Sequence, residues 1–220
     1  MRLIAEMGPE DYWPEFKDSA SNRIISVSQA NNDSGIARQF TVEPTSINFQ
    51  VDSAKGLPPS AVLSNEHVST LFKGIQSFCE AFKITDLARA GLRTLVLATV
   101  GDSKDAVKRA AGTLNAEMVA AVENVLGAIT DVGVAFDGEG SDKLQFHMRV
   151  GPYSSQEAPK YFEQSVADAM TSQANFIADL DFFEINFSMT VRAMQWSRAP
   201  VEKVEKLLSK VGPVFLGKAV

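Results

Sequence analysis

The sequence predicts an α+β fold, with helices packed on one face of a largely antiparallel sheet. Three observations lead to this prediction. β-rich stretches occur in both halves of the chain, stretches with helical apolar spacing separate them, and short polar turns join neighbouring strands. We expect two unequal β-rich halves, residues 1–126 and 127–220, or one compact domain.

The first half is expected to open with a β-hairpin and a third strand. Two β-rich runs flank a polar cluster that ends at Gly35, and Pro44 precedes an alternating run. After a loop rich in glycine and proline, an apolar stripe at helical spacing predicts a helix capped by Ser64. Cys79 lies in that stripe, and we interpret it as a small buried residue rather than a reactive thiol. The predicted elements are strands at 22–29, 36–42 and 45–51, a loop at 54–60 and a helix at 64–83.

The middle of the chain contains a strand followed by a long helical stretch. Residues 87–100 fit helical spacing poorly, and their β-branched end and Gly91 favour a strand that is mostly buried on both faces. Beyond a turn at 101–103, apolar residues recur every three or four positions through 104–126. This spacing predicts a helix, which Gly112 is expected to split or kink.

The second half is expected to contain a hairpin, a short helix, an acidic strand and a final helix. In the run at 143–150, apolar and polar residues alternate without interruption, so His147 and Arg149 share the polar face. Pro200 is placed at the start of the final helix, and the apolar tail at 213–220 is expected to dock or to contact a partner. The predicted elements are strands at 128–136, 143–150 and 175–189, a turn at 137–142, a short helix at 160–172, and a helix after Pro200 that Gly212 and Pro213 stop or kink.

Composition excludes several classes of protein. The 220 residues include 27 acidic and 21 basic side chains, and a net charge of −6 argues against a dedicated nucleic-acid binder. A single cysteine precludes an intrachain disulfide. The longest apolar run is interrupted by Arg89 and Arg93, and the first residues do not resemble a signal peptide. We therefore expect a cytoplasmic protein that does not enter the membrane.

The sequence contains none of the motifs that identify common catalytic sites. Only two histidines are present, His67 and His147, and they are far apart without a paired-ligand spacing. No phosphate-binding loop of the GxxxxGK type and no GxSxG nucleophile motif occurs. We expect no metal, no cofactor and no catalytic residues, and the sequence favours a protein that is not an enzyme.

The polar feature that stands out is the segment "RAGLR", residues 89–93. On a strand Arg89, Gly91 and Arg93 share a face, with the two arginines roughly 13 Å apart. In the acidic strand, Asp179 and Asp181 also share a face. Because buried charges must be paired and arginine pairs best with carboxylates, the favoured interpretation is that these residues pair and fix the register of the strands. Two alternatives stay open: the arginines hold an acidic or phosphorylated partner, or the face is simply solvated.

The segments "RAGLR" and "DLDFF", with an amphipathic helix before the first and a C-terminal helix after the second, resemble a sporadically distributed family of uncharacterised bacterial proteins. The family pattern is an arginine, one residue, Gly-Leu-Arg, then Tyr and Asn. Arg89, Gly91, Leu92 and Arg93 match it, and the chain departs from it at Thr94 and Leu95. The resemblance covers about residues 45–100 and 175–216. It implies a cytoplasmic protein from a bacterium or a mobile element, and no established reaction.

Two functions remain open at this point. The first is a non-enzymatic protein-interaction or assembly subunit, oligomeric or in a heterocomplex, since catalytic motifs are missing and the tail and outer strands could contact another chain. The second is a small-ligand or nucleotide-sensing domain that uses the strand face of Arg89 and Arg93. The predicted binding residues are Arg89, Arg93, His147, Arg149, Asp179 and Asp181.

Overall fold

The chain forms two compact units, which we describe separately. The first comprises residues 1–84 and 158–170, and the second comprises 85–157 and 171–220. The sequence-based division fell between residues 126 and 127, and Gly127 lies inside the second unit. The computed structural model describes residues 15–19, 24–31, 36–42, 46–53, 58–64, 66–140, 142–154, 174–189 and 193–216.

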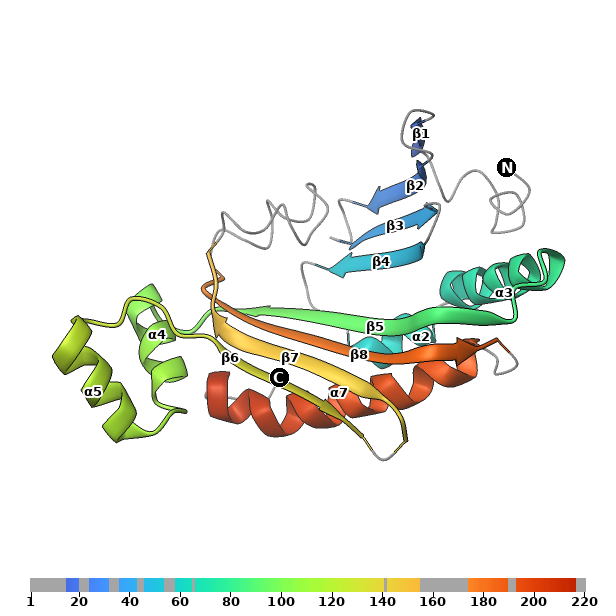
Figure 1. The fold of residues 1–220 in the computed structure, drawn as a ribbon. Coiled ribbons are helices and arrows are strands. Elements are labelled where there is room, and N and C mark those ends of the chain that lie inside the picture. Colours follow the sequence, from blue (N-terminus) through green and yellow to red (C-terminus); the bar gives the residue numbers. More distant parts are fainter. Residues whose placement is uncertain are drawn as a thin grey trace. The chain divides into compact units, whose positions relative to one another are not determined.

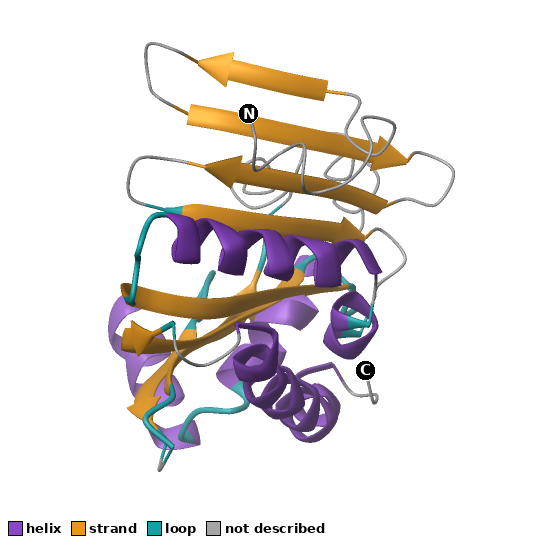
Figure 2. Cartoon of the chain, turned by 90° about the vertical axis from the view of Figure 1, so that its right-hand side faces the viewer, coloured by secondary structure: helices purple, strands orange, loops and turns teal. Residues whose placement is uncertain are grey.

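The first unit contains an antiparallel sheet with the strand order β1-β2-β3-β4 (Figure 2). The predicted hairpin and third strand are confirmed as β2, β3 and β4. β1 was not predicted, because its short sequence EFKDS places charged residues between few apolar ones. The strands are β1 (Glu15–Ser19), β2 (Ile24–Asn31), β3 (Ile36–Val42) and β4 (Ile47–Ser53).

Two helices follow this sheet, α2 (Pro59–Leu63) and α3 (Glu66–Ala81). The loop predicted at 54–60 is wrong at its end, because Pro59 starts α2, where a missing N–H costs no helical hydrogen bond. The capping role predicted for Ser64 is also wrong, since Ser64 closes α2 and its hydroxyl donates to the carbonyl of Ala61. Cys79 is buried, as predicted, and this burial raises the pKa of its thiol.

The second unit is built on a sheet with the strand order β5-β8-β7-β6, in which every neighbouring pair is antiparallel (Figure 1). The edge strand β5 pairs with β8, which lies far from it in the sequence, whereas β6 and β7 form the predicted hairpin. The elements are β5 (Asp86–Ala98), α4 (Ser103–Ala111), α5 (Ala116–Leu126), β6 (Val134–Glu139), β7 (Gln145–Pro152), β8 (Phe176–Ser188) and α7 (Ala193–Leu216).

The core of the second unit lies between one face of this sheet and the helices α4 and α7. The alternation predicted for β7 is confirmed, because Met148 and Val150 are buried there together with Leu180 of β8. Ala106 of α4 and Val204 of α7 are fully buried against them. The predicted arrangement, helices on one face of an antiparallel sheet, is therefore confirmed for this unit.

Several predicted boundaries in the second unit are wrong. β6 begins at Val134 rather than at 128, and it continues through residues assigned to a turn. α7 begins at Ala193, so Pro200 and Pro213 both lie inside it. Each proline removes one main-chain hydrogen bond, and Pro200 is itself buried. The helix predicted at 160–172 and the last residues of the tail lie outside the described residues.

The helical stretch after β5 splits into α4 and α5 at residues 112–115. This link begins with Gly112, where the split was predicted. Asp102 and Asp105 form a capping box at the start of α4. The side chain of Asn115 accepts hydrogen bonds from the amides of Glu117 and Met118, which caps α5. A cap at each start makes the two helices separate elements rather than one kinked helix.

Asn175 connects three strand ends of the second unit. Its Oδ1 accepts a hydrogen bond from the amide of Val100 at 2.8 Å, and its Nδ2 donates to the carbonyl of Gly101 at 3.0 Å. Its own amide donates to the carbonyl of Ala98, and its carbonyl accepts from the amide of Tyr153. One residue thus holds the end of β5 and the end of β7 beside the start of β8.

We expect Asn175→Ala to lower the free energy of unfolding by about 1–3 kcal/mol, because it leaves the buried amide of Val100 without its acceptor. Urea denaturation of the purified chain measures this change. Asn124→Ala, at an exposed position of α5, is the matched control and should change stability by less than about 0.5 kcal/mol. Equal urea midpoints for the two variants would show that the hydrogen bonds of the Asn175 side chain do not contribute to the stability of the fold.

Candidate functional site

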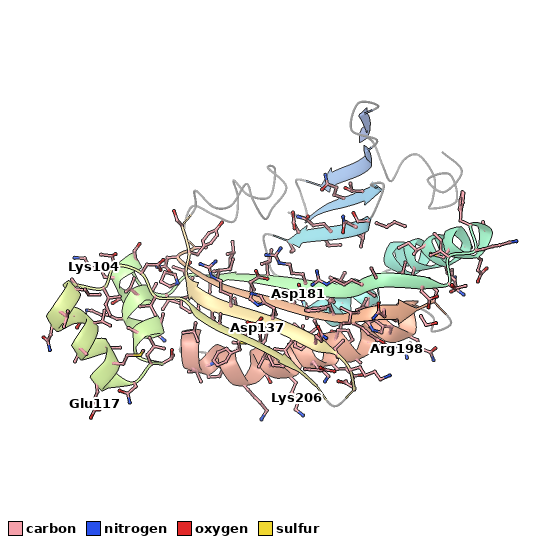
Figure 3. The ribbon with its side chains drawn as sticks, viewed as in Figure 1. Lys104, Glu117, Asp137, Asp181, Arg198 and Lys206 are labelled. Carbon is pink, nitrogen blue, oxygen red and sulfur yellow. The ribbon has the colours of Figure 1, made fainter. Side chains whose placement is uncertain are left out.

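All six predicted binding residues lie on one face of the β5–β8–β7 sheet, opposite the face that packs against α4 and α7. Strand alternation places the odd-numbered residues of these strands on this face. The register aligns Arg93 with Asp181 and Asp181 with His147, and it aligns Asp179 with Arg149. Figure 3 labels Asp181 and Asp137 on this sheet, and Arg198 and Lys206 on α7.

Arg93 forms a two-pronged ion pair with Asp179. Its Nε donates to Oδ1 at 2.9 Å and its Nη2 donates to Oδ2 at 2.7 Å. Arg93 stands opposite Asp181 in the register, so its side chain reaches diagonally across to the neighbouring strand. The side chain of Asp179 is only 12 % exposed while that of Arg93 is 51 % exposed, so the guanidinium shields the carboxylate from solvent.

Arg89 forms the second pair, with Asp181. Arg89 stands opposite Ile185, four residues along β8 from its partner, and it crosses Phe183 to reach the carboxylate. Its Cζ lies 4.2 Å from the centroid of the Phe183 ring, a cation–π distance. The prediction that these arginines and aspartates pair is therefore confirmed.

Gly91 makes room for this arrangement. It stands opposite Phe183, and a Cβ at position 91 would lie 3.3 Å from the Cβ of Phe183 and 3.6 Å from Oδ1 of Asp181. A side chain here would therefore be tight against the Cβ of Phe183, while its distance to the carboxylate is an ordinary contact. Close packing between β5 and β8 thus explains the glycine between the two arginines.

The prediction that β5 is mostly buried on both faces is wrong. Arg89, Gly91 and Arg93 are exposed, and no residue of β5 is fully buried. The apolar composition of the segment suggested complete burial. Each ion pair, however, requires only that its carboxylate be shielded from solvent. The long side chains of the arginines keep part of each guanidinium in water.

His147 and Arg149 are not brought into the arginine–aspartate pairs. His147 Nδ1 lies 2.6 Å from Oδ1 of Asp137, which stands opposite it on β6. Sequence reasoning missed Asp137 because it was assigned to a turn. Arg149 is exposed and forms no ion pair with any residue that the structure describes.

The chemistry available on this face is limited. Within the described residues there is no group of three or more histidine, cysteine, aspartate or glutamate side chains that could hold a metal ion. Across the same part of the chain, no helix is both long and apolar enough to cross a membrane. Both predicted anion-binding arginines already have carboxylate partners, so this face holds strands together.

A second candidate site lies on α5, which buries none of its residues. Four large apolar side chains occupy one stripe of this helix and remain exposed to solvent. The helical spacing that predicted this segment shows which side is apolar, but it does not show whether another element covers that side. The stripe, which we call the α5 stripe, consists of Met118, Val122, Val125 and Leu126.

No family model, no curated protein and no solved structure matches the chain. The family resemblance of Arg89, Gly91, Leu92 and Arg93 therefore stays a prediction. The function of the chain is therefore inferred from the geometry of the two candidate sites.

A double-mutant cycle at Arg93 and Asp179 should give a coupling energy of about 1–3 kcal/mol in urea denaturation, because the pair makes two charge-assisted hydrogen bonds with a shielded carboxylate. We expect each single change to lower the free energy of unfolding, since either one removes both hydrogen bonds of the pair. Arg149→Ala, on the same face, is the control and should be nearly neutral. Additive effects of Arg93→Ala and Asp179→Ala would contradict a structural role for the pair.

Proposed function

We propose that this chain is a non-enzymatic protein-interaction or assembly subunit, and that the α5 stripe is its contact surface. The observation that carries the proposal is the exposure of large apolar side chains on a helix that has no fully buried residue. Val125 is 78 % exposed and Leu126 is 80 % exposed. Such a helix gains little from its own chain and most from a partner.

The α5 stripe differs from the other exposed apolar residues of the second unit. Phe136 and Ile185 stand on separate strands and on opposite faces of the sheet, and Val214 lies near the end of α7, a scattering that is normal for soluble proteins. The members of the stripe instead recur at helical spacing on one short helix. Contiguous exposed apolar surface of this kind marks interaction sites, and each such side chain contributes about 1.5–3 kcal/mol when it becomes fully buried.

The alternative, a small-ligand or nucleotide-sensing domain, has less support. It needs Arg89 and Arg93 to bind an anion, whereas both already bind Asp181 and Asp179. A ligand would have to displace a carboxylate from each arginine. Arg149 is the exposed arginine of this face without such a partner in the described part of the chain, and one exposed cation gives little specificity.

The test is photo-crosslinking with a photoreactive phenylalanine analogue placed at Val122, in the host cell. Because Val122 lies within the stripe, we expect a protein adduct of discrete mass. The same analogue at Glu202, an exposed position of α7, is the matched control and should give none. An absence of adducts at Val122, or the same adducts at both positions, would contradict the proposal.

A second expectation separates contact from folding. Leu126→Asp should leave the free energy of unfolding within about 0.5 kcal/mol of the wild type under dilute conditions, since the side chain is exposed. Val204→Asp should unfold the chain, because it buries a charge without a partner. Urea denaturation compares the two. A large loss of stability in Leu126→Asp would show that the stripe serves the fold of its own chain.

A further inference from the structure

We infer that the partner of the α5 stripe is a second copy of this chain, with the two α5 helices packed antiparallel about a two-fold axis. This inference rests on the proposed function and assigns the occupant of its contact surface. The charges at the ends of α4 and α5 support this assignment.

The charges of α5 are all of one sign. Glu117 and Glu123 are its only charged residues, and from residue 110 to residue 142 the chain contains acidic side chains and no lysine or arginine. Glu123 lies in the last turn of α5, where the helix dipole favours a cation, and that turn contains no basic residue. The last turn of α5 therefore contributes no positive charge of its own, and an incoming partner can supply one.

The last turn of α4 supplies such charges. Lys108 and Arg109 lie there, both are exposed, and neither forms an ion pair with a described residue. A link of only four residues, 112–115, separates α4 from α5, so these two bases lie near the start of α5 rather than its end. Figure 3 shows this arrangement: Lys104 at the start of α4 and Glu117 at the start of α5 lie at opposite ends of the helix pair.

An antiparallel second copy brings the two sets of charges together. If the stripes of two copies pack against each other in opposite directions, the start of α5 in one copy lies beside the end of α5 in the other. Lys108 and Arg109 of each copy then approach Glu123 of the other. A two-fold axis makes each of these contacts occur twice, which closes the assembly as a dimer.

The parallel alternative lacks this complementarity. It would place the two Glu123 side chains at the same end of the dimer, and the bases of both copies together at the other end. One end of the contact would then carry the Glu123 carboxylates of both copies, and the other end would carry Lys108, Arg109 and Glu117 of both copies, so the charges would balance at neither end. The charge pattern therefore favours the antiparallel arrangement.

The experiment is sedimentation velocity on the full chain from about 1 to about 200 µM, with charge-reversal variants. We expect a reversible dimer. Glu123→Lys alone and the double change Lys108→Glu with Arg109→Glu should each raise the dissociation constant about tenfold or more. Combining all three changes should return it to within about threefold of the wild type. Lys206→Glu, at an exposed position of α7, is the matched control and should leave the constant unchanged.

The outcomes distinguish the partner from the proposed function. A wild-type chain that stays monomeric over this range overturns the second copy as partner, while a crosslink at Val122 to another protein would leave the proposed function standing. A dimer that Leu126→Asp does not weaken forms through another surface and overturns the second copy as the partner of the α5 stripe, whereas an absence of any adduct at Val122 overturns the proposed function. A dimer that Leu126→Asp abolishes, but that the combined charge reversals do not restore, overturns the antiparallel arrangement.

Discussion

The ion pair between Arg93 and Asp179 is the interaction on which the second unit most depends. It joins β5 to β8 through two residues that are 86 positions apart in the sequence. Joining distant segments costs loop-closure entropy, so the register of these strands needs specific contacts to define it. A slip of one residue would move both arginines to the face that α4 and α7 cover, where no water could solvate them.

This constraint also explains the composition of β5 and β8. The two aspartates of β8 are tolerated in this apolar strand because each pairs with a guanidinium group, and Arg89 also stacks on the ring of Phe183. Gly91 leaves room for the Cβ of Phe183 on the neighbouring strand. The charged side chains on this face of the sheet thus hold its strands together. The exposed apolar surface suited to a contact lies on α5.

The charged strands could be predicted from the sequence because their chemistry requires partners. Arginines and aspartates inside apolar strands cost free energy unless they meet, and RAGLR and DLDFF contain complementary pairs at matching alternation. The alternation of apolar and polar residues in β7 also placed His147 and Arg149 on one face. The structure therefore reproduces the alternation of apolar and polar residues that the sequence shows in these strands.

The features that sequence analysis missed depend on tertiary context. Nothing local indicates that Pro200 is accepted inside α7, since this requires the surrounding core to hold the helix together despite the lost hydrogen bond. Likewise, the apolar spacing of Val122 and Val125 continues that of α4, but only α4 meets the sheet. Periodicity defines an apolar face and does not say what packs on it.

Hydrogen exchange at low and high protein concentration tests the central claim most directly, because it follows the strands and the contact helix in one sample. We predict that amides of 116–126 exchange more slowly as concentration rises, while the rates for 86–98 and 176–188 stay constant. Exchange in 116–126 that is independent of concentration, or a change in the strands instead, would contradict an account in which the charged sheet is the framework and α5 is the contact.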